Sequence, residues 1–434
     1  MRRRYTGIVS LVLMLSIVAC GSPPVPSTAT LSTTADTAAP APGTALPSPS
    51  SMVAAATGAG SAAENVFGTN GPIPIGIAIA ITGPVAATGA DEANGAKIAE
   101  AYFNNHGGVN GRQIRIVVED TGGDEAGAIR AFTRLITESN VIGIVGPTTS
   151  QQTLAAAPIA VKAKTPMISP SANAQGVTQL GEYVSRTSAP VTALVPVALR
   201  AALAQKPDAK RVAVFYAQND AASVSETAVF QNTAKALNLT VVSTQKFVTG
   251  DASFAPQVAD AINQRAEIVA ISAPLAESGA LVQQLRAAGY TGVIVGGDGI
   301  NTPGVFPACK AACANVIAAQ AYIPDAPNSA NLTFKFAYLE QFKKDPPQFA
   351  AQTFAAVQVF VEALRIVDMK QTLATRTLAS IRTDLNTQAH IGMYATPLGE
   401  ITFDVNRDIV QITFYPVQLK LNPDGVSGTF VFLK

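Results

Sequence analysis

Residues 75–81, Ile75-Gly76-Ile77-Ala78-Ile79-Ala80-Ile81, carry the clearest signal of fold class in the sequence. This continuous apolar run ends at a Thr82-Gly83-Pro84 break, and such a run is typical of a parallel strand buried on both faces. A helical pattern follows at about residues 92–105, and a second strand pattern follows at 114–118. A strand, a helix and a second strand in this order form a right-handed βαβ unit. The sequence therefore predicts an α/β protein built on parallel sheets.

The same alternation runs along the chain in two series. The first has strands at residues 75–81, 114–118, 141–145 and 167–168, with helices at about 92–105, 125–138 and 150–162. The second has strands at 211–216, 240–247, 268–272 and 293–295, with helices at about 193–204, 225–237, 254–263 and 277–288. Residues 331–381 are mostly helical in pattern, and the strand-like segments 401–403 and 409–419 are expected to complete a sheet already begun. Two successive series predict two doubly wound lobes.

The first twenty residues have the pattern of a secretory signal. Three arginines, Arg2 to Arg4, precede an apolar run at 8–18 that is shorter than the ~20 residues a membrane span needs. The segment closes with Ile17-Val18-Ala19-Cys20, which resembles the lipobox of bacterial lipoproteins, in which the cysteine is lipidated. We therefore expect a lipoprotein signal peptide at 1–20 and an extracytoplasmic protein anchored to the cell membrane through Cys20. The alternative is an ordinary signal peptide with an incidental cysteine.

The next segment, residues 21–71, consists mainly of Ser, Thr, Ala, Pro and Gly, and its only charged residues are Asp36 and Glu64. Such a composition predicts a disordered tether, because it offers few large side chains to bury. The remaining ~360 residues are enough for two domains. A net charge of +1 argues against a nucleic-acid partner. We expect no later segment to span a membrane, so the predicted membrane contact is through the lipid anchor only.

Three loops at the predicted carboxyl ends of strands carry candidate ligand groups, because ligands collect at such ends in open α/β sheets. Gly146-Pro147-Thr148-Thr149-Ser150 leads into a helix, whose free N–H groups would attract a carboxylate; alternatively, Ser150 only caps that helix. Ser169-Pro170-Ser171-Ala172-Asn173 adds hydroxyl and amide groups, or forms a plain turn. Asp298, in Gly296-Gly297-Asp298-Gly299, would pair with an ammonium group, or only stabilise its own turn.

Catalytic and metal motifs are missing from the sequence. The only histidines are His106 and His390, and there is neither a P-loop nor a G-x-G-x-x-G motif that opens a helix after a strand. Residues 404–408 begin like a calcium loop but lack its later glycine and glutamate, so a hairpin turn is expected there. We therefore expect no enzyme activity, no cofactor and no metal. Outside the cytoplasm, Cys309 and Cys313 would close a disulfide, with two free thiols as the alternative.

The order and spacing of these motifs resemble the type I periplasmic-binding proteins of the leucine/isoleucine/valine-binding group. The resemblance covers residues 72–434 and is carried by residues 75–84, Gly95-Ala96, Asn104, 107–111, 146–150, 168–172, Arg186-Thr187, 285–289 and 296–299. It implies two lobes that are joined by three crossings and clamp the ligand between them. Lobe one would take residues 72–189 and 321–399, and lobe two would take 190–320 and 400–434.

The resemblance also implies roles for individual residues. The Ser150 hydroxyl and the loop at Ala172 and Asn173 would hold a ligand α-carboxylate, and Asp298 would meet the α-ammonium group. The full predicted ligand-contacting set is Thr149, Ser150, Ser171, Ala172, Asn173, Asp220, Ala221 and Asp298.

Two positions depart from the family pattern. Ala221 stands where members often have a tyrosine, and a second aromatic is missing near Pro274 and Leu275. Because both positions belong to the side-chain pocket, the candidate ligands are branched-chain and other amino acids, amides, urea-like solutes and aromatic acids.

The main functional hypothesis is the capture subunit of an ABC importer that works with a two-component permease and two ATPase subunits. The alternative is an anchored sensor that reports the ligand to a membrane kinase.

Overall fold

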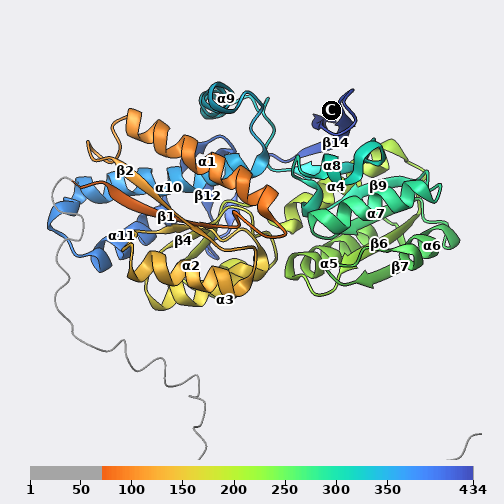
Figure 1. Ribbon diagram of the computed structural model, residues 1–434, viewed down its shortest axis with the longest axis horizontal. Helices are drawn as coiled ribbons and strands as arrows, with labels where there is room; N and C mark the ends of the chain where they lie inside the picture. The colour runs from red at the N-terminus through yellow and green to blue at the C-terminus, as the bar shows by residue number, and fades with distance from the viewer. Residues whose placement is uncertain (1–70, 434) are drawn as a thin grey trace, which may run out of the picture. The chain divides into compact units, whose positions relative to one another are not determined.

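The computed structural model describes residues 71–433, all of which belong to one compact unit, Gly60–Lys434. The predicted signal peptide, Cys20 and nearly all of the predicted tether lie outside the described residues. Within them, the predicted α/β class is confirmed, since strands and helices alternate through two lobes, each with its own sheet (Figure 1).

The first lobe contains a five-stranded sheet in the order β2-β1-β3-β4-β5, and every pair in it is parallel. Its strands are β1 (Ile73–Ile79), β2 (Ile114–Asp120), β3 (Ile144–Val145), β4 (Met167–Ser169) and β5 (Val184–Arg186). The short strand β5 was not predicted, because three residues carry too little pattern to be recognised.

Helices cover both faces of this sheet because β1 is apolar on both sides. Ile73, Ile75, Ile77 and Ile79 pack in one core cluster with α1 (Ala86–Asn105) and α10 (Gln348–Lys370). Ala78 packs in a second cluster with α2 (Glu125–Thr137) and α3 (Ser150–Lys162). A fully buried isoleucine stabilises the fold by about 1.5–3 kcal/mol relative to an exposed one. The same face as α10 also carries α9 (Ser329–Phe342) and α11 (Leu378–Ile391).

The second lobe contains a seven-stranded sheet in the order β15-β14-β10-β9-β8-β6-β7. Strands β6 to β10 are parallel, and β14 and β15 extend the sheet in antiparallel pairs. The bounds are β6 (Arg211–Ala217), β7 (Thr240–Phe247), β8 (Ile268–Ser272), β9 (Val293–Gly296), β10 (Ile317–Gln320), β14 (Tyr415–Leu421) and β15 (Gly428–Phe432). The helices are α4 (Val191–Gln205), α5 (Ala221–Ala236), α6 (Ala255–Asn263), α7 (Leu275–Ala287) and α8 (Val305–Cys309). Helices α4 and α5 pack on one face, and α6 and α7 pack on the other.

The C-terminal strands differ from the expectation that they would complete one existing sheet. Strands β11 (Tyr394–Thr396), β12 (Gly399–Phe403) and β13 (Ile409–Val410) form a separate three-stranded antiparallel sheet, and only β14 and β15 join the second lobe. Ile401 and Ile409 are buried in the first-lobe core. This packing extends the first lobe past the expected boundary at residue 399. The predicted hairpin turn at 404–408 lies between β12 and β13.

Three chain crossings connect the lobes. They follow β5, β10 and β13, and the third lies at residues 411–414, after the small sheet. The Gln411 amide nitrogen donates to the carbonyl of Ala321 at 2.6 Å and to that of Thr413 at 3.0 Å, which joins the second crossing to the third. The Gln348 side chain accepts from the Ala321 N–H at 2.6 Å. Buried amide side chains therefore satisfy the backbone polar groups of these crossings.

Two helices differ from the sequence expectation. Helix α1 begins at Ala86, six positions before the expected start at 92, because it follows the Gly83-Pro84 turn directly rather than beginning where the apolar periodicity becomes clear.

Helix α10 is long and apolar enough to cross a membrane by length and composition, although no such segment was expected. Its most apolar window is 83% buried inside the protein, so α10 acts as the central helix of the first-lobe core.

A short-range disulfide and a long-range ion pair add two further links within the described chain. Cys309 and Cys313 form a disulfide with their Cα atoms 5.2 Å apart, next to the buried face of α8. Arg186, at the end of β5, is 2% exposed and donates to both carboxylate oxygens of Asp408 at 2.6 and 2.5 Å. This bidentate pair fixes the hairpin at 404–408 against the first-lobe sheet.

Candidate functional site

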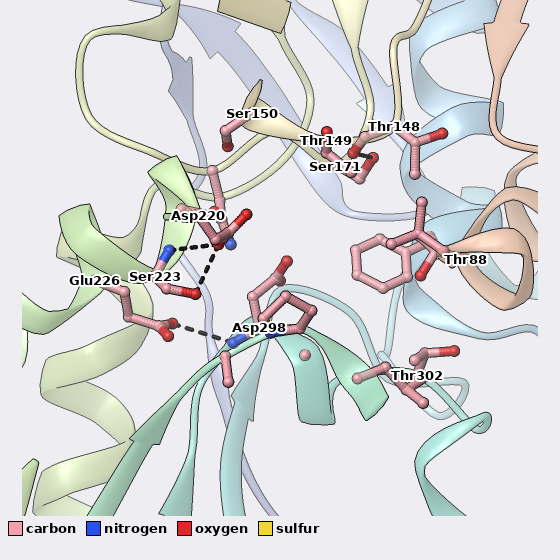
Figure 2. Close-up of a pocket in the computed structure, with 18 residues that line it drawn as sticks. Thr88, Thr148, Thr149, Ser150, Ser171, Asp220, Ser223, Glu226, Asp298 and Thr302 are labelled. Carbon is pink, nitrogen blue, oxygen red and sulfur yellow. Dashed lines mark hydrogen bonds between the residues drawn. The ribbon is translucent and has the colours of Figure 1, made fainter. Parts of the chain in front are cut away.

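A cavity between the two lobes brings most of the predicted ligand-contacting residues together (Figure 2). Its first-lobe wall comes from the ends of β3 and β4 and from α1 and α10: Val85, Thr88, Thr148, Thr149, Ser150, Ser171, Asn173 and Phe349. Its second-lobe wall follows β6, β8 and β9: Asp220, Ala222, Ser223, Glu226, Ala273, Pro274, Leu275, Asp298, Gly299 and Thr302. The cavity therefore lies where the carboxyl ends of the parallel strands meet.

Most of the predicted set lines this cavity, and two members do not. Thr149, Ser150, Ser171, Asn173, Asp220 and Asp298 line it. Ala172 is fully buried behind the wall, where its carbonyl accepts from the Ser188 hydroxyl at 2.5 Å. Ala221 is the first residue of α5, and its neighbour Ala222 lines the cavity instead.

Thr149, and not Ser150, caps helix α3. The Thr149 hydroxyl accepts from the Gln152 N–H at 3.1 Å, and the Gln152 side chain accepts from the Thr149 N–H at 3.2 Å, which forms a capping box. Ser150 accepts from the Ala174 N–H at 3.2 Å. A hydroxyl that accepts one hydrogen bond still has its own hydrogen to donate. Ser150 can therefore donate to a ligand beside the helix N-terminus, where negative charge is favoured.

The sharp turn before this helix depends on a glycine. Gly146 has φ +129, and a Cβ there would lie 2.0 Å from the carbonyl oxygen of Ala78. Any other residue would push the loop away from β1. The glycine therefore lets Thr148 approach closely enough for its hydroxyl to accept from the Ala80 N–H at 2.9 Å.

Asn173 is the least satisfied polar side chain of the first-lobe wall. It is 2% exposed, and neither atom of its amide group has a hydrogen-bond partner within the described residues. The amide lies close enough to Asp298 to oppose the burial-driven rise in the pKa of that carboxyl. Leaving a buried polar group unpaired costs about 1–3 kcal/mol. A ligand that accepts from the Asn173 nitrogen and donates to its oxygen would remove that cost.

The second-lobe wall carries the negative groups. Asp220 caps α5, accepting from the N–H of Ser223 at 2.8 Å and from its hydroxyl at 2.6 Å. Asp298 points from the second lobe towards the first-lobe hydroxyl groups (Figure 2). Burial, and then the negative charge of Asp220, raise the pKa of Asp298 to about 7. Lys, Arg and His do not occur among the described residues that line the cavity, so a positive charge would have to come from the ligand.

Two buried glutamates support the walls of the cavity: Glu92 lies behind the first-lobe wall, and Glu226 is part of the second-lobe wall. Glu92 on α1 is fully buried and accepts from the Thr148 hydroxyl at 2.6 Å, and burial raises its pKa to about 7. On α5, one carboxyl oxygen of Glu226 lies 2.6 Å from the Ser272 hydroxyl and the other accepts from the Asp298 N–H at 3.1 Å, and burial raises the pKa of Glu226 to about 8. Gly297 passes so close to Glu226 that a Cβ there would lie 1.8 Å from its carboxylate oxygen.

Hydrogen bonds bridge the lobes beside the cavity. The Thr302 hydroxyl donates to Asp91 at 3.2 Å, and the Gln175 N–H donates to the Ser225 hydroxyl at 2.9 Å. Burial raises the pKa of Asp91 to about 6, and its bond to Thr302 opposes that rise. The two walls are therefore held together by direct contacts of modest strength.

The apolar part of the cavity lacks second-lobe aromatic side chains among its described lining residues, as expected from the positions that depart from the family pattern. Ala222, Pro274 and Leu275 line it from the second lobe, where the family pattern favours aromatic residues. Phe349, from the first turn of α10, is the one aromatic side chain among the described lining residues. The shape available to a ligand side chain therefore differs from that of a pocket with two second-lobe tyrosines.

Several site residues were not predicted from the sequence. Thr148 lies in the 146–150 loop but is not in the predicted ligand-contacting set. Thr88, Thr302 and Phe349 also line the cavity, and they lie outside the sequence motifs described above. Glu226 had one usable signal, because it lies on the buried face of α5 with Ser223 and Phe230. Among residues 71–433, no group of three or more His, Cys, Asp or Glu side chains is arranged to hold a metal ion.

Two parallel-sheet lobes, three crossings and a polar cavity at the strand ends define a two-lobed binding protein of the type I periplasmic class. Residues 72–425 match the periplasmic binding protein family, and the chain belongs to that family, in its leucine/isoleucine/valine-binding group. The family consists of solute-binding proteins, so the chain is not an enzyme. Its homologues are extracytoplasmic binding proteins.

Relatives with different ligands share this fold. The chain is 28% identical over 232 residues to the Leu/Ile/Val-binding protein BraC3 of Rhizobium johnstonii. The match covers 53% of this chain and 62% of that protein, so the chain spans about three fifths of the length of this relative. The branched-chain amino acid binding protein LivJ of Streptococcus pneumoniae, solved with isoleucine, is 25% identical with a TM-score of 0.73, covering 84% of this chain and 99% of that one. A solute-binding protein of R. palustris, solved with benzoate, is 22% identical with a TM-score of 0.72, and the match covers 84% of this chain and 96% of that one. At this identity the similarity shows a shared fold and nothing more.

Proposed function

We propose that this chain is the extracytoplasmic capture subunit of an ABC importer and binds an amino acid, or a similar small polar solute with an ammonium group, in the cavity between its lobes. One observation carries the proposal. The cavity sets a half-buried carboxyl, Asp298, opposite a wall that offers the Ser150 hydroxyl, the α3 N-terminus and the Asn173 amide, which lies near Asp298 but makes no hydrogen bond of normal geometry within the described residues. An α-amino acid presents the complementary pair, a cation next to an anion.

The polar contacts divide between the two ends of such a ligand. The ligand carboxylate would accept from Ser150 and Asn173, close to the first N–H groups of α3. The ammonium group would lie against Asp298, with the oxygen of Asn173 as a second acceptor. Because the ligand would touch both lobes, its binding would favour the closed arrangement of the clamshell.

The apolar lining of the cavity bears on the side chain of the ligand. The lining residues Val85, Leu275 and Phe349 favour a small apolar or mixed side chain, since apolar area removed from water contributes about 25 cal/mol per Å². Of the relatives named above, BraC3 is a Leu/Ile/Val-binding protein and LivJ was solved with isoleucine, which supports an aliphatic amino acid as the first candidate, whereas the R. palustris protein was solved with benzoate.

The proposed setting comes from the N-terminal pattern. Anchored through Cys20 and held by a tether, the protein would deliver its ligand to permease subunits in the same membrane, driven by two ATPase subunits.

A thermal-shift screen of the purified protein tests the proposal. The panel contains aliphatic, aromatic and basic L-amino acids, simple amides, urea and benzoate. A solute that binds only the folded state raises Tm with its concentration. We expect at least one amine-bearing member to raise Tm. A rise with benzoate or urea and with no amino acid would contradict the ammonium site, and no rise with any solute would contradict the importer assignment.

A further inference from the structure

The hydrogen bonds around Glu92 need more protons than the hydroxyl groups alone provide. The Ser171 hydroxyl contacts the carbonyl oxygen of Thr148 at 2.5 Å and also makes a very short contact with a carboxyl oxygen of Glu92. A hydroxyl carries one hydrogen, and O–H···O bonds are usually about 2.7–2.8 Å long. Two oxygen pairs this close each need a hydrogen between them. If Ser171 donates to Thr148, the second hydrogen has to come from Glu92.

Thr148 cannot supply that hydrogen. Its hydroxyl accepts from the Ala80 N–H at 2.9 Å and donates its single hydrogen to the other carboxyl oxygen of Glu92 at 2.6 Å. The network is complete when Glu92 is a carboxylic acid. Its protonated oxygen donates to Ser171, and its other oxygen accepts from Thr148.

Glu226 stands in the same relation to a serine in the second lobe. The Ser272 hydroxyl lies 3.0 Å from the carbonyl oxygen of Ser223 and 2.6 Å from one carboxyl oxygen of Glu226. The other carboxyl oxygen accepts from the Asp298 N–H at 3.1 Å. One serine hydrogen again faces two acceptors, and a protonated Glu226 satisfies both contacts.

The surroundings of both glutamates favour the neutral form. The charged groups that face Glu92 are Asp91 and Asp298, and those that face Glu226 are Asp298 and Asp220; all are acidic. Burial is the largest cause of the raised pKa of each glutamate, and these neighbours add to it. Neither glutamate forms a salt bridge within the described residues.

We propose that Glu92 and Glu226 are neutral positioning residues: at about pH 6 each is a carboxylic acid in the folded protein, donates its proton to one serine and fixes one wall of the cavity. Glu92 holds the Thr148 and Ser171 loops together beneath Ser150 and Asn173. Glu226 holds the backbone of Asp298. The walls thereby keep their shape without adding negative charge beside Asp298 and Asp220. The link to ligand recognition rests on the proposed function, whereas the protonation itself does not.

Ligand-free infrared spectroscopy and unfolding measurements test the proposal on wild type, Glu92→Gln, Glu226→Gln and the double variant. Glutamine is the matched replacement, because its amide donates one hydrogen bond and accepts another where the carboxylic acid did. Glu138→Gln, at an exposed position, is the control. We expect wild type to show a carboxylic acid C=O band at about pH 6, and each buried variant, but not the control, to lose part of it.

The pH dependence of stability has a fixed sign. Both folded-state pKa values, about 7 and about 8, lie above the ordinary value of 4.5, so the folded protein binds more protons than the unfolded chain between those limits. The stability that these two groups contribute is therefore present at low pH and lost as the pH rises towards 7 and 8. Tm of wild type should consequently fall more between about pH 5 and about pH 8 than Tm of the double variant.

The infrared and unfolding results together show whether Glu92 and Glu226 are protonated in the folded protein. Retained Tm at about pH 5 and a flatter pH profile in the glutamine variants support the proposal. Because burial also raises the pKa values of Asp91 and Asp298, the decisive infrared signal is the part of the band that each variant removes. A wild-type spectrum without the band overturns the proposal even if no variant folds, and so does an unchanged band or pH profile in folded variants. Since no ligand is used, a failed solute screen would not affect this result.

Discussion

Replacing Asp298 by asparagine should remove most of the affinity for an amine-bearing ligand while leaving the shape of the cavity unchanged. In the closed cavity the ligand ammonium group would lose its water and face Asp298 with no basic side chain nearby among the described lining residues. Truncating one partner of a buried charge pair costs about 2–5 kcal/mol. At 1.4 kcal/mol per tenfold, that is roughly a 30- to 4,000-fold rise in Kd.

Ser150→Ala provides the internal comparison. It removes one neutral donor, while the N–H groups at the α3 N-terminus still face the carboxylate. The expected loss is about 1 kcal/mol, or roughly fivefold in Kd. Asp208→Asn removes an exposed carboxylate on the second lobe and should leave Kd unchanged.

Isothermal titration calorimetry with the solute that gives the largest Tm rise measures all four proteins. The pH dependence provides a second check, because the pKa of ligand-free Asp298 is raised to about 7 by burial and by Asp220. An ammonium ligand needs the ionised carboxylate, so wild-type affinity should fall as the pH drops below about 7, and Asp298→Asn should lose this dependence. Equal Kd values for wild type and Asp298→Asn would show that Asp298 only shapes its turn or that the ligand is not an amine.

Three further predictions address the anchor, the hinge and the fold. Cys20→Ser should release the protein from membranes without changing ligand affinity, as measured by fractionation; a processed variant that stays in the membrane would show that the lipoprotein interpretation is wrong. Ligand binding should close the lobes about the crossings near Ala189, Ala321 and residues 411–414, which small-angle scattering would detect as a smaller radius of gyration; identical dimensions with saturating ligand would count against closure. Asp408→Asn should lower the free energy of unfolding by about 1.5–3 kcal/mol in urea, because it breaks the charged hydrogen bonds to buried Arg186, and an unchanged midpoint would contradict that role.

The parallel-sheet fold was predictable because its signal is local. The run at 75–81 is apolar on both faces, which identifies a covered parallel strand, and the rule for strand ends then selects the loops at 146–150, 169–173 and 296–299. Strands β7 and β8 were placed at their observed bounds for the same reason. The three-residue strand β5 and the separate small sheet were missed, because pairing between short segments depends on the tertiary fold.

The finer structure of the site depends on contacts between distant residues. Glu92 meets Thr148 and Ser171, which are 56 and 79 positions away, and nothing near Glu92 in the sequence indicates those partners. The sequence indicated Ser150 as the possible helix cap, whereas Thr149 caps α3 in the structure. Two adjacent hydroxyl residues fit the capping pattern equally well, and only the backbone conformation distinguishes them. Arg186 was noted only as part of the family pattern, and its partner Asp408 lies 222 positions further along the chain.

Hydrogen–deuterium exchange with and without the solute that most raises Tm tests whether the ligand is captured between the two lobes. Capture in the cavity would slow exchange in both lobes at once, at residues 149–152 and 172–174 in the first and at 220–226 and 298–300 in the second, because the ligand and the closed walls protect these backbone N–H groups. We therefore expect slower exchange in both lobes together. Slower exchange in one lobe only, or only at segments away from the cavity, would contradict ligand capture between the lobes.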